Sequence, residues 1–244
     1  MPEPARCHAV VPAAGSGSRL GAALPKQYLL LAGRSLLEWS VQALLDAPFI
    51  ATVTVVVSPG DARAQALLGP RPRLRVLPVG GATRRDSVLA GVQAPGIHWQ
   101  ARDWVLVHDA ARPALDAASL QRLHAELADD AVGGLLAVPV SDTVKRAASQ
   151  VGGPAGSSDS PPVSRVAATL SRDGLWLAQT PQMFRHGVLL PALQRHPEVT
   201  DEAAAVEAEG LMPRLVRGER QNFKVTTADD LALMGAWLGR TGPV

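Results

Sequence analysis

The sequence predicts an α/β fold, in which a Rossmann-like, mainly parallel sheet carries helices on both faces. Strand and helix signals alternate along most of the 244 residues. The strand signals are short, continuous apolar runs, which are typical of parallel strands buried on both faces. A chain of this length can form one large α/β domain, so we expect a single domain over residues 1–244.

The first predicted strand, residues 9–11, runs into a loop of small residues. The backbone of such a loop can lie close to a ligand. Its N–H groups, with the charges of Arg19 and Lys26, are suited to holding a polyphosphate and stabilising charge that develops during its reaction. A dinucleotide-binding fingerprint would need glycine in place of Leu20, and a P-loop would need Gly-Lys-Ser/Thr at residues 21–23. A plain strand-to-helix turn is the alternative for this loop taken alone.

The remaining elements follow in alternation, each with its own signal. Ser35 and Glu38 form a capping box, and Asp116 caps a helix that has leucines on one face. Further strands are expected at residues 53–57, 74–78, 104–108, 135–140, 176–179, 215–216 and 223–225, with a turn at 180–182. One further helix is expected to end near residue 94, and two others to cover residues 185–194 and 200–210. The last helix is expected to begin at residues 227–230 and to end near residue 239.

Polar segments follow two of these strands at the sheet edge where ligands bind in open α/β folds. Residues 80–87 begin a helix there, and Asp109 follows the strand at residues 104–108. A carboxylate at this edge, facing the polyphosphate loop, suits Mg²⁺, which takes few protein carboxylates and keeps water ligands. Alternatively, Asp109 caps a turn, and Arg112 could pair with it or reach a substrate phosphate. We expect His108 to be packed rather than catalytic.

Two acidic residues, Asp201 and Glu202, stand in the first turn of a predicted helix. The helix dipole alone explains acids at this position. We therefore assign neither of them to the site.

The alternation breaks between residues 143 and 172, where no α/β unit is evident. Residues 152–162 are rich in Gly, Ser and Pro, a composition typical of a flexible loop. We expect this loop to be mobile.

Composition and charge disfavour several classes of protein. The net charge of +2 does not indicate a nucleic-acid partner. No apolar run approaches the length of a membrane-spanning helix. Cys7 is the only cysteine, which excludes an intrachain disulfide and a cysteine-based metal cluster, and we expect a cytoplasmic protein. Only three of the 24 basic residues are lysines, namely Lys26, Lys145 and Lys224. Each is a candidate for a role that needs a compact ammonium, although arginine-biased composition explains Lys145 equally well.

Seven motifs occur in order between residue 8 and about residue 238. They are PAAGSGSRLGAALPKQYLLLAGRSLLEWS, GGATRRDSV, VHDAARP, PVSDTVK, SRDGLWLAQTPQMF, TDEAAAVE and NFKVTTADDL. Together they resemble the 2-C-methyl-D-erythritol 4-phosphate cytidylyltransferases, a nucleotidyltransferase family of the non-mevalonate isoprenoid pathway. Several separate motifs in the right order are more specific than any one of them.

The resemblance implies cytidylyl transfer from CTP, with Mg²⁺, to 2-C-methyl-D-erythritol 4-phosphate. The products would be 4-diphosphocytidyl-2-C-methyl-D-erythritol and pyrophosphate. It also implies a homodimer in which a protruding β-arm at residues 143–172, with its flexible tip at residues 152–162, reaches the second subunit. The implied catalytic residues are Arg19, Lys26, Lys224 and, from the partner's arm, Arg172. The implied CTP-binding residues are Pro12, Ala13, Ala14, Gly15, Gly17, Gly81, Ser87 and Asp109. Of these, the Gly81 main chain and the Ser87 hydroxyl contact the cytosine ring, and Asp109 also binds the metal. The implied polyol-binding residues are Arg112, Thr143, Thr180 and Thr200.

Three alternatives remain at this point. A ribitol-5-phosphate cytidylyltransferase of the same superfamily would keep the CTP half of the site and change the polyol half. An NAD-dependent dehydrogenase is disfavoured, because Leu20 breaks the fingerprint and no acid to bind ribose is evident around Val57. A nucleotide-binding regulator without activity is disfavoured, because the charged residues that catalysis would need are all present.

Overall fold

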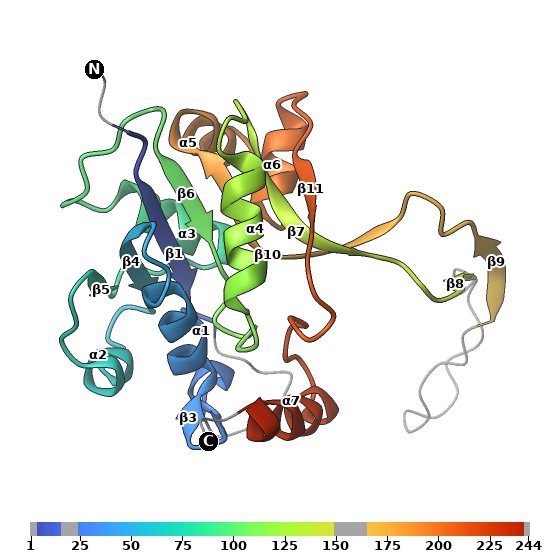
Figure 1. Cartoon of the computed structure of the whole chain (residues 1–244), viewed down its shortest axis with the longest axis horizontal. Coiled ribbons are helices and arrows are strands. Elements are labelled where there is room, and N and C mark those ends of the chain that lie inside the picture. Colours follow the sequence, from blue (N-terminus) through green and yellow to red (C-terminus); the bar gives the residue numbers. More distant parts are fainter. Residues whose placement is uncertain (1–3, 16–23, 149–164, 242–244) are drawn as a thin grey trace, which may run out of the picture. The chain divides into compact units, whose positions relative to one another are not determined.

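The structure is a computed structural model that describes residues 4–15, 24–148 and 165–241 (Figure 1). The chain forms two compact units. The first comprises residues 1–137 and 178–244, and the second comprises residues 138–177.

The first unit is built on a seven-stranded sheet with the order β11-β7-β10-β6-β1-β4-β5. The strands are β1 (Cys7–Pro12), β4 (Ile50–Val56), β5 (Leu74–Leu77), β6 (Trp104–Val107), β7 (Gly133–Pro139), β10 (Trp176–Arg185) and β11 (Arg214–Arg217). The pairs β1/β4, β1/β6, β4/β5 and β7/β11 are parallel, whereas β10 is antiparallel to β6. The predicted mainly parallel α/β sheet is confirmed.

Seven α-helices are described. They are α1 (Leu36–Leu45), α2 (Arg63–Leu68), α3 (Arg84–Gln93), α4 (Ala117–Leu127), α5 (His186–Arg195), α6 (Glu202–Ala208) and α7 (Ala228–Thr241). The predicted capping box of Ser35 and Glu38 opens α1, and Asp116 caps α4. A 3₁₀ turn, η2 (Lys26–Tyr28), and a hairpin of β2 (Leu30–Leu31) with β3 (Arg34–Ser35) connect β1 to α1.

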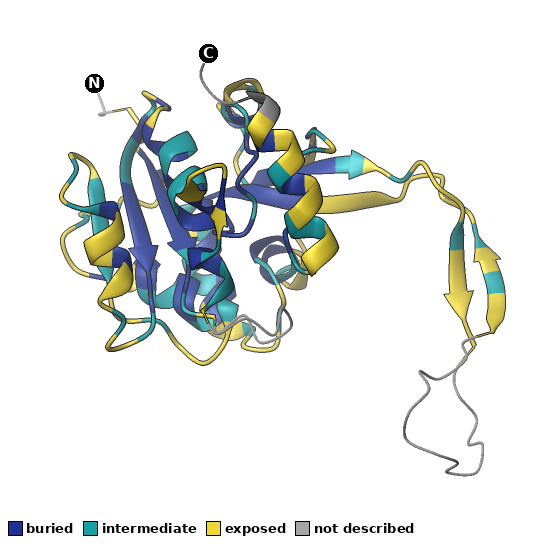
Figure 2. Ribbon diagram, turned by 90° about the horizontal axis from the view of Figure 1, so that it is seen from below, coloured by how far each residue is buried: buried dark blue, intermediate teal, exposed yellow. Residues whose placement is uncertain are grey.

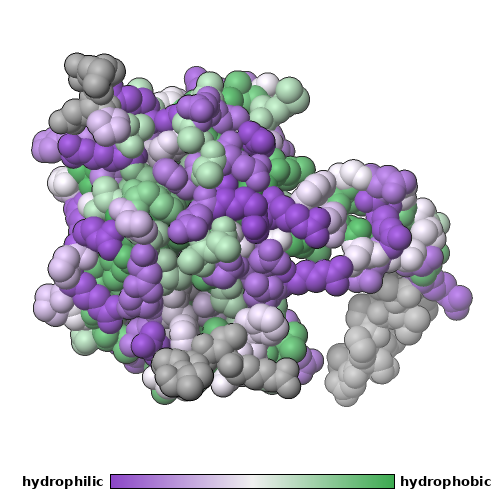
Figure 3. Space-filling view, in the orientation of Figure 1, coloured by the Kyte–Doolittle hydropathy of each residue, from purple (hydrophilic) through white to green (hydrophobic). Residues whose placement is uncertain are grey.

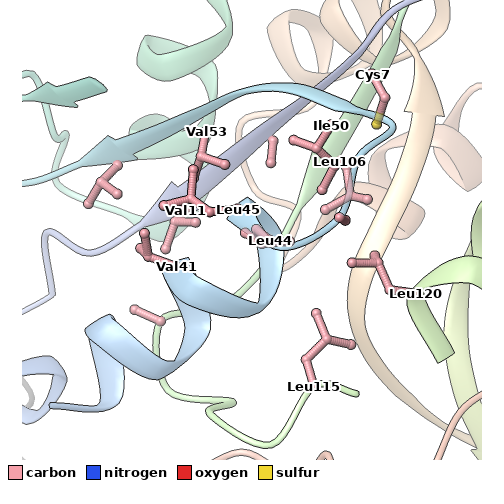
Figure 4. Close-up of a cluster of buried hydrophobic side chains, with 14 of the residues drawn as sticks. Cys7, Val11, Val41, Leu44, Leu45, Ile50, Val53, Leu106, Leu115 and Leu120 are labelled. Carbon is pink, nitrogen blue, oxygen red and sulfur yellow. The ribbon is translucent and has the colours of Figure 1, made fainter. Parts of the chain in front are cut away.

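The sheet is buried on both faces, because successive residues of β1 enter two different cores. Val11 packs in a cluster with residues of α1, α2 and α4, and Figure 4 shows Val41 and Leu44 of α1 in that cluster. Val10 packs in a second cluster with residues of α3, α5 and α6, including Val88. Figure 2 shows the central strands buried between these layers. Burial on both faces explains why the strands read as continuous apolar runs.

Two predictions near the end of the chain are wrong. Residues 180–182 continue β10 instead of turning, and pairing with β6 begins at Gln182. Residues 223–225 form no strand, and the N–H of Val225 donates to the carbonyl oxygen of Ala111 at 2.8 Å. That segment therefore follows the loop after β6 instead of adding a strand to the sheet, and it reaches the site described below.

The second unit contains the antiparallel hairpin of β8 (Val144–Ala147) and β9 (Val166–Leu170). Lys145 Nζ donates to Thr169 Oγ1 at 2.6 Å across this hairpin. The hairpin lies within the predicted arm at residues 143–172, and the predicted tip at residues 152–162 lies outside the described residues. Its part in dimerisation stays a prediction.

The surface seen in Figure 3 intersperses hydrophilic and hydrophobic residues. Within the described ranges, no helix combines the length and apolar character needed to cross a membrane.

Candidate active site at the carboxyl edge of the sheet

A cavity of about 320 Å³ lies in the first unit, where the ends of β1 and β6 meet the start of α3. It is lined by Pro12, Ala13, Ala14, Gly15, Lys26, Gln27, Gly81, Ala82, Thr83, Arg84, Ser87, Asp109, Ala110, Ala111, Lys224 and Thr226. Most residues predicted for the CTP half of the site therefore meet at one place. The exceptions are Gly17 and Arg19, which lie outside the described residues.

Two side chains donate hydrogen bonds to the backbone of the loop after β1. Gln27 Nε2 donates to the carbonyl oxygen of Ala13 at 2.8 Å, and Ser58 Oγ donates to that of Ala14 at 2.7 Å. A Cβ on Gly80 would collide with the Cβ of Ala14, so glycine is needed for this close approach. These contacts fix the orientation of the loop backbone that lines the cavity.

The start of α3 also lines the cavity, and its residues form hydrogen bonds with one another. Thr83 and Asp86 form a capping box. The N–H of Gly81 donates to Ser87 Oγ at 3.2 Å, and the Ser87 hydroxyl donates to the Thr83 carbonyl oxygen at 3.0 Å. The two groups expected to contact cytosine are therefore already positioned by each other.

Asp109 stands at the end of β6 among three cations. Its Oδ1 accepts from Arg84 Nε at 2.8 Å, and its Oδ2 lies 2.8 Å from Lys224 Nζ and 3.8 Å from Arg112 Nε. Burial alone would raise the pKa of Asp109, but Arg84, Lys224 and Arg112 outweigh burial and hold that pKa well below its usual range. Asp109 is therefore ionised at neutral pH.

The backbone of Asp109 is fixed by the buried residue Thr180. The N–H of Asp109 donates to Thr180 Oγ1 at 3.0 Å, and Thr180 Oγ1 lies 3.0 Å from His108 Nδ1. His108 Nε2 lies 3.1 Å from the carbonyl oxygen of Arg112, which can only accept, so Nε2 carries the proton and Thr180 donates to Nδ1. Burial lowers the pKa of His108 to about 4, so the ring is neutral at pH 7. His108 is packed, as expected.

Glu202 adds a charged residue that the sequence interpretation missed. It is 0% exposed, and its Oε1 and Oε2 accept from Arg84 Nη1 and Nη2 at 2.8 and 3.0 Å. The expectation that the acids at 201 and 202 serve only the helix dipole is wrong, because Asp201 caps α6 and also accepts from Gln182 Nε2 at 2.9 Å. No local pattern signals an ion pair between residues 118 positions apart.

Two of the three lysines line the cavity from segments far apart in the chain. Lys26 Nζ lies 3.5 Å from the carbonyl oxygen of Val225, next to Lys224 in the chain. Lys145 belongs to the second unit. The scarcity of lysine in the sequence was thus a useful signal for Lys26 and Lys224.

The residues predicted for the polyol half are more dispersed. Arg112 is 12% exposed at its side chain and donates to the carbonyl oxygen of Asn222 at 2.7 Å. Thr200 is exposed and precedes the cap of α6. Thr143 and Arg172 are exposed residues of the second unit. The substrate contacts assigned to these residues and to Thr180 stay predictions.

The residues at the cavity are compatible with Mg²⁺ only together with a polyphosphate. The described residues contain no group of three His, Cys, Asp or Glu side chains that could hold a metal ion. Asp109 is the one carboxylate among the described residues that line the cavity. Mg²⁺ commonly uses one or two protein carboxylates and takes its other ligands from water and phosphate. A single carboxylate in a cavity that also contains Lys26 and Lys224 fits that pattern.

Comparisons with known proteins agree with this arrangement. The family model for 2-C-methyl-D-erythritol 4-phosphate cytidylyltransferase (IspD) matches residues 7–240. The chain is 52% identical over 232 residues to the protein of that name from Dechloromonas aromatica, covering 93% of this chain and 95% of the relative. It is 53% identical over 237 residues to the one from Laribacter hongkongensis, covering 96% of each.

Solved structures give the same result. A crystal structure of 4-diphosphocytidyl-2C-methyl-D-erythritol synthase has a TM-score of 0.81 and 36% identity, covering 96% of this chain and 99% of that one. The 2-C-methyl-D-erythritol 4-phosphate cytidylyltransferase of Francisella tularensis has a TM-score of 0.76 and 31% identity, with the same coverage. The chain therefore belongs to the 2-C-methyl-D-erythritol 4-phosphate cytidylyltransferase family.

Proposed function

We propose that this protein transfers the cytidylyl group of CTP to 2-C-methyl-D-erythritol 4-phosphate. The products are 4-diphosphocytidyl-2-C-methyl-D-erythritol and pyrophosphate, in the synthesis of isoprenoid precursors. The observation that carries the proposal is the cavity of the first unit. It combines the loop of small residues after β1 with Lys26, Asp109 and Lys224 in a chain of this family.

The chemistry needs positioning and charge stabilisation rather than a protein base. A phosphate monoester has a second pKa near ~6 and is largely a dianion at neutral pH, so its oxygen can attack the α-phosphorus directly. A P–O bond forms to that oxygen while the bond to pyrophosphate breaks, and negative charge grows on the equatorial and leaving oxygens. In this proposal, Lys26 and Arg19 stabilise the negative charge on these oxygens. Lys224 and the partner's arm residue Arg172 hold the attacking phosphate in line.

We propose that Asp109 holds Mg²⁺ together with the triphosphate. The bound ion would neutralise charge on the phosphate oxygens. Arg84 holds the carboxylate of Asp109 through an ion pair, and Thr180 holds the residue by accepting from its backbone N–H. We also propose that the protein is a homodimer and that it is located in the cytoplasm.

A pyrophosphate-release assay tests this function. With CTP and Mg²⁺, we expect release with 2-C-methyl-D-erythritol 4-phosphate and little with ribitol 5-phosphate, and we expect chelation of the metal to abolish it. Mass spectrometry of the product should show the cytidine diphosphate linkage. Release with ribitol 5-phosphate alone would replace the proposed substrate, and activity that survives chelation would remove the role given to Mg²⁺.

A further inference from the structure

The buried carboxylate of Glu202 has a partner at the cavity but does not itself line it. Its side chain is 0% exposed, and it forms a two-point ion pair with Arg84, which does line the cavity. A buried carboxylate is costly unless it is paired, so this geometry is kept only while Arg84 stays in place. Glu202 therefore constrains Arg84, a residue at the wall of the site.

The guanidinium of Arg84 divides its donors between two carboxylates. Both Nη groups face Glu202, and Nε faces Oδ1 of Asp109 at 2.8 Å. The five N–H donors of the guanidinium lie fixed in one plane, so the two-point pair with Glu202 sets the direction in which Nε–H points toward Asp109. Glu202 therefore fixes the orientation from which Arg84 reaches Asp109.

This fixed orientation matters because Asp109 has further partners. Lys224 lies 2.8 Å from its Oδ2, on the other side of the carboxylate. If Arg84 turned to grip both oxygens of Asp109, it would compete with Lys224 and with any ligand of that carboxylate. The contacts form a chain, Glu202–Arg84–Asp109–Lys224, that runs from α6 to the cavity.

We propose that Glu202 is a positioning residue of the nucleotide site, which orients Asp109 and Lys224 through Arg84. The proposal rests on the proposed function for its consequence, which is weaker binding and slower use of CTP when Glu202 is lost. A merely structural Glu202 would instead anchor α6 to α3, and its loss would lower thermal stability without changing the nucleotide site.

The first test is Glu202→Gln, with Asp201→Asn as the matched control. Both changes remove one carboxylate from the start of α6, and asparagine can still cap the helix, but Asp201 has no contact with Arg84 among its described hydrogen bonds. Calorimetry with Mg²⁺ and the non-reactive analogue α,β-methylene-CTP measures binding apart from turnover. We expect the affinity to fall roughly 10–100-fold in Glu202→Gln, the usual cost of losing a group that orients a ligand-binding residue. We expect Asp201→Asn to bind like wild type.

The second test reads the guanidinium itself, without any ligand. The Nε–H of Arg84, assigned by its loss in Arg84→Lys, should give a slowly exchanging nitrogen–proton NMR signal in wild type and should shift or exchange faster in Glu202→Gln. Lysine keeps the charge but lacks the planar fork that pairs with Glu202 at two points while donating to Asp109, so Arg84→Lys should reproduce the loss of CTP affinity. Adding Glu202→Gln to Arg84→Lys should then cause little further loss, because both changes break the same chain.

The outcomes separate this inference from the proposed function. An Arg84 signal and a nucleotide affinity that are both unchanged in Glu202→Gln would overturn the inference. If that variant does not fold, wild-type affinity in Arg84→Lys would overturn it. Wild-type protein that binds the analogue but releases no pyrophosphate would contradict the proposed function alone.

Discussion

Replacing Lys26 with alanine is expected to lower turnover roughly 10²–10³-fold, because one electrostatic contact to the transition state is removed. Lys26 lines the cavity, and its Nζ lies 3.5 Å from the carbonyl oxygen of Val225. The Lys26 side chain is half-buried and belongs to none of the hydrophobic core clusters, so the fold should remain intact. Steady-state pyrophosphate release and thermal unfolding, measured on the same preparation, check both parts of this expectation.

Arg34→Ala is the matched control for Lys26→Ala. Arg34 is an exposed cation in the nearby β3 strand, with its guanidinium 5.0 Å from the ring centroid of Trp39, and it does not line the cavity. Its loss changes the net charge equally and should leave turnover near wild type. Equal activities of the two variants would show that Lys26 has no special part in the reaction.

Arg172→Ala is expected to be nearly inactive on its own and to regain activity when mixed with Lys26→Ala. We propose that Arg172 serves the active site of the second subunit, since it belongs to the unit that contains the β-arm. A hybrid dimer would then have one site with both residues and one site with neither. Random exchange makes about half of the dimers hybrid, so about a quarter of the wild-type activity should return in symmetric, closed dimers.

The mixing experiment needs evidence that subunits exchange, which differently tagged copies recovered together on a sizing column provide. If both residues served the same subunit's site, every site in the mixture would lack one of them. Demonstrated exchange without recovered activity would therefore exclude the assignment of Arg172 to the partner's site.

Much of the first unit could be predicted because its signals are local. The apolar runs at β1, β4 and β6 and the caps at Ser35 and Asp116 each depend on neighbouring residues. Parallel strands also end at a common edge, so the order of elements alone predicted that the loop after β1 and Asp109 would meet. The cavity confirms that they do.

The missed features depend on pairings between distant residues. Glu202 resembles an ordinary acid in the first turn of a helix, and only the folded chain places it against Arg84. Residues 223–225 have the composition of a strand, but Ala111 holds them along the loop after β6. Residues 180–182 contain a proline typical of turns, yet they stay within β10. In each case tertiary contacts outweigh the local preference.

The most direct test of the proposed site is a crystal structure with Mg²⁺ and α,β-methylene-CTP. We expect the triphosphate to lie against the backbone of residues 13–15 and beside Lys26, with the polar edge of cytosine at Gly81 and Ser87. Metal density should bridge Asp109 and the phosphates. A nucleotide bound elsewhere on the chain, with this cavity left empty, would contradict the proposed site.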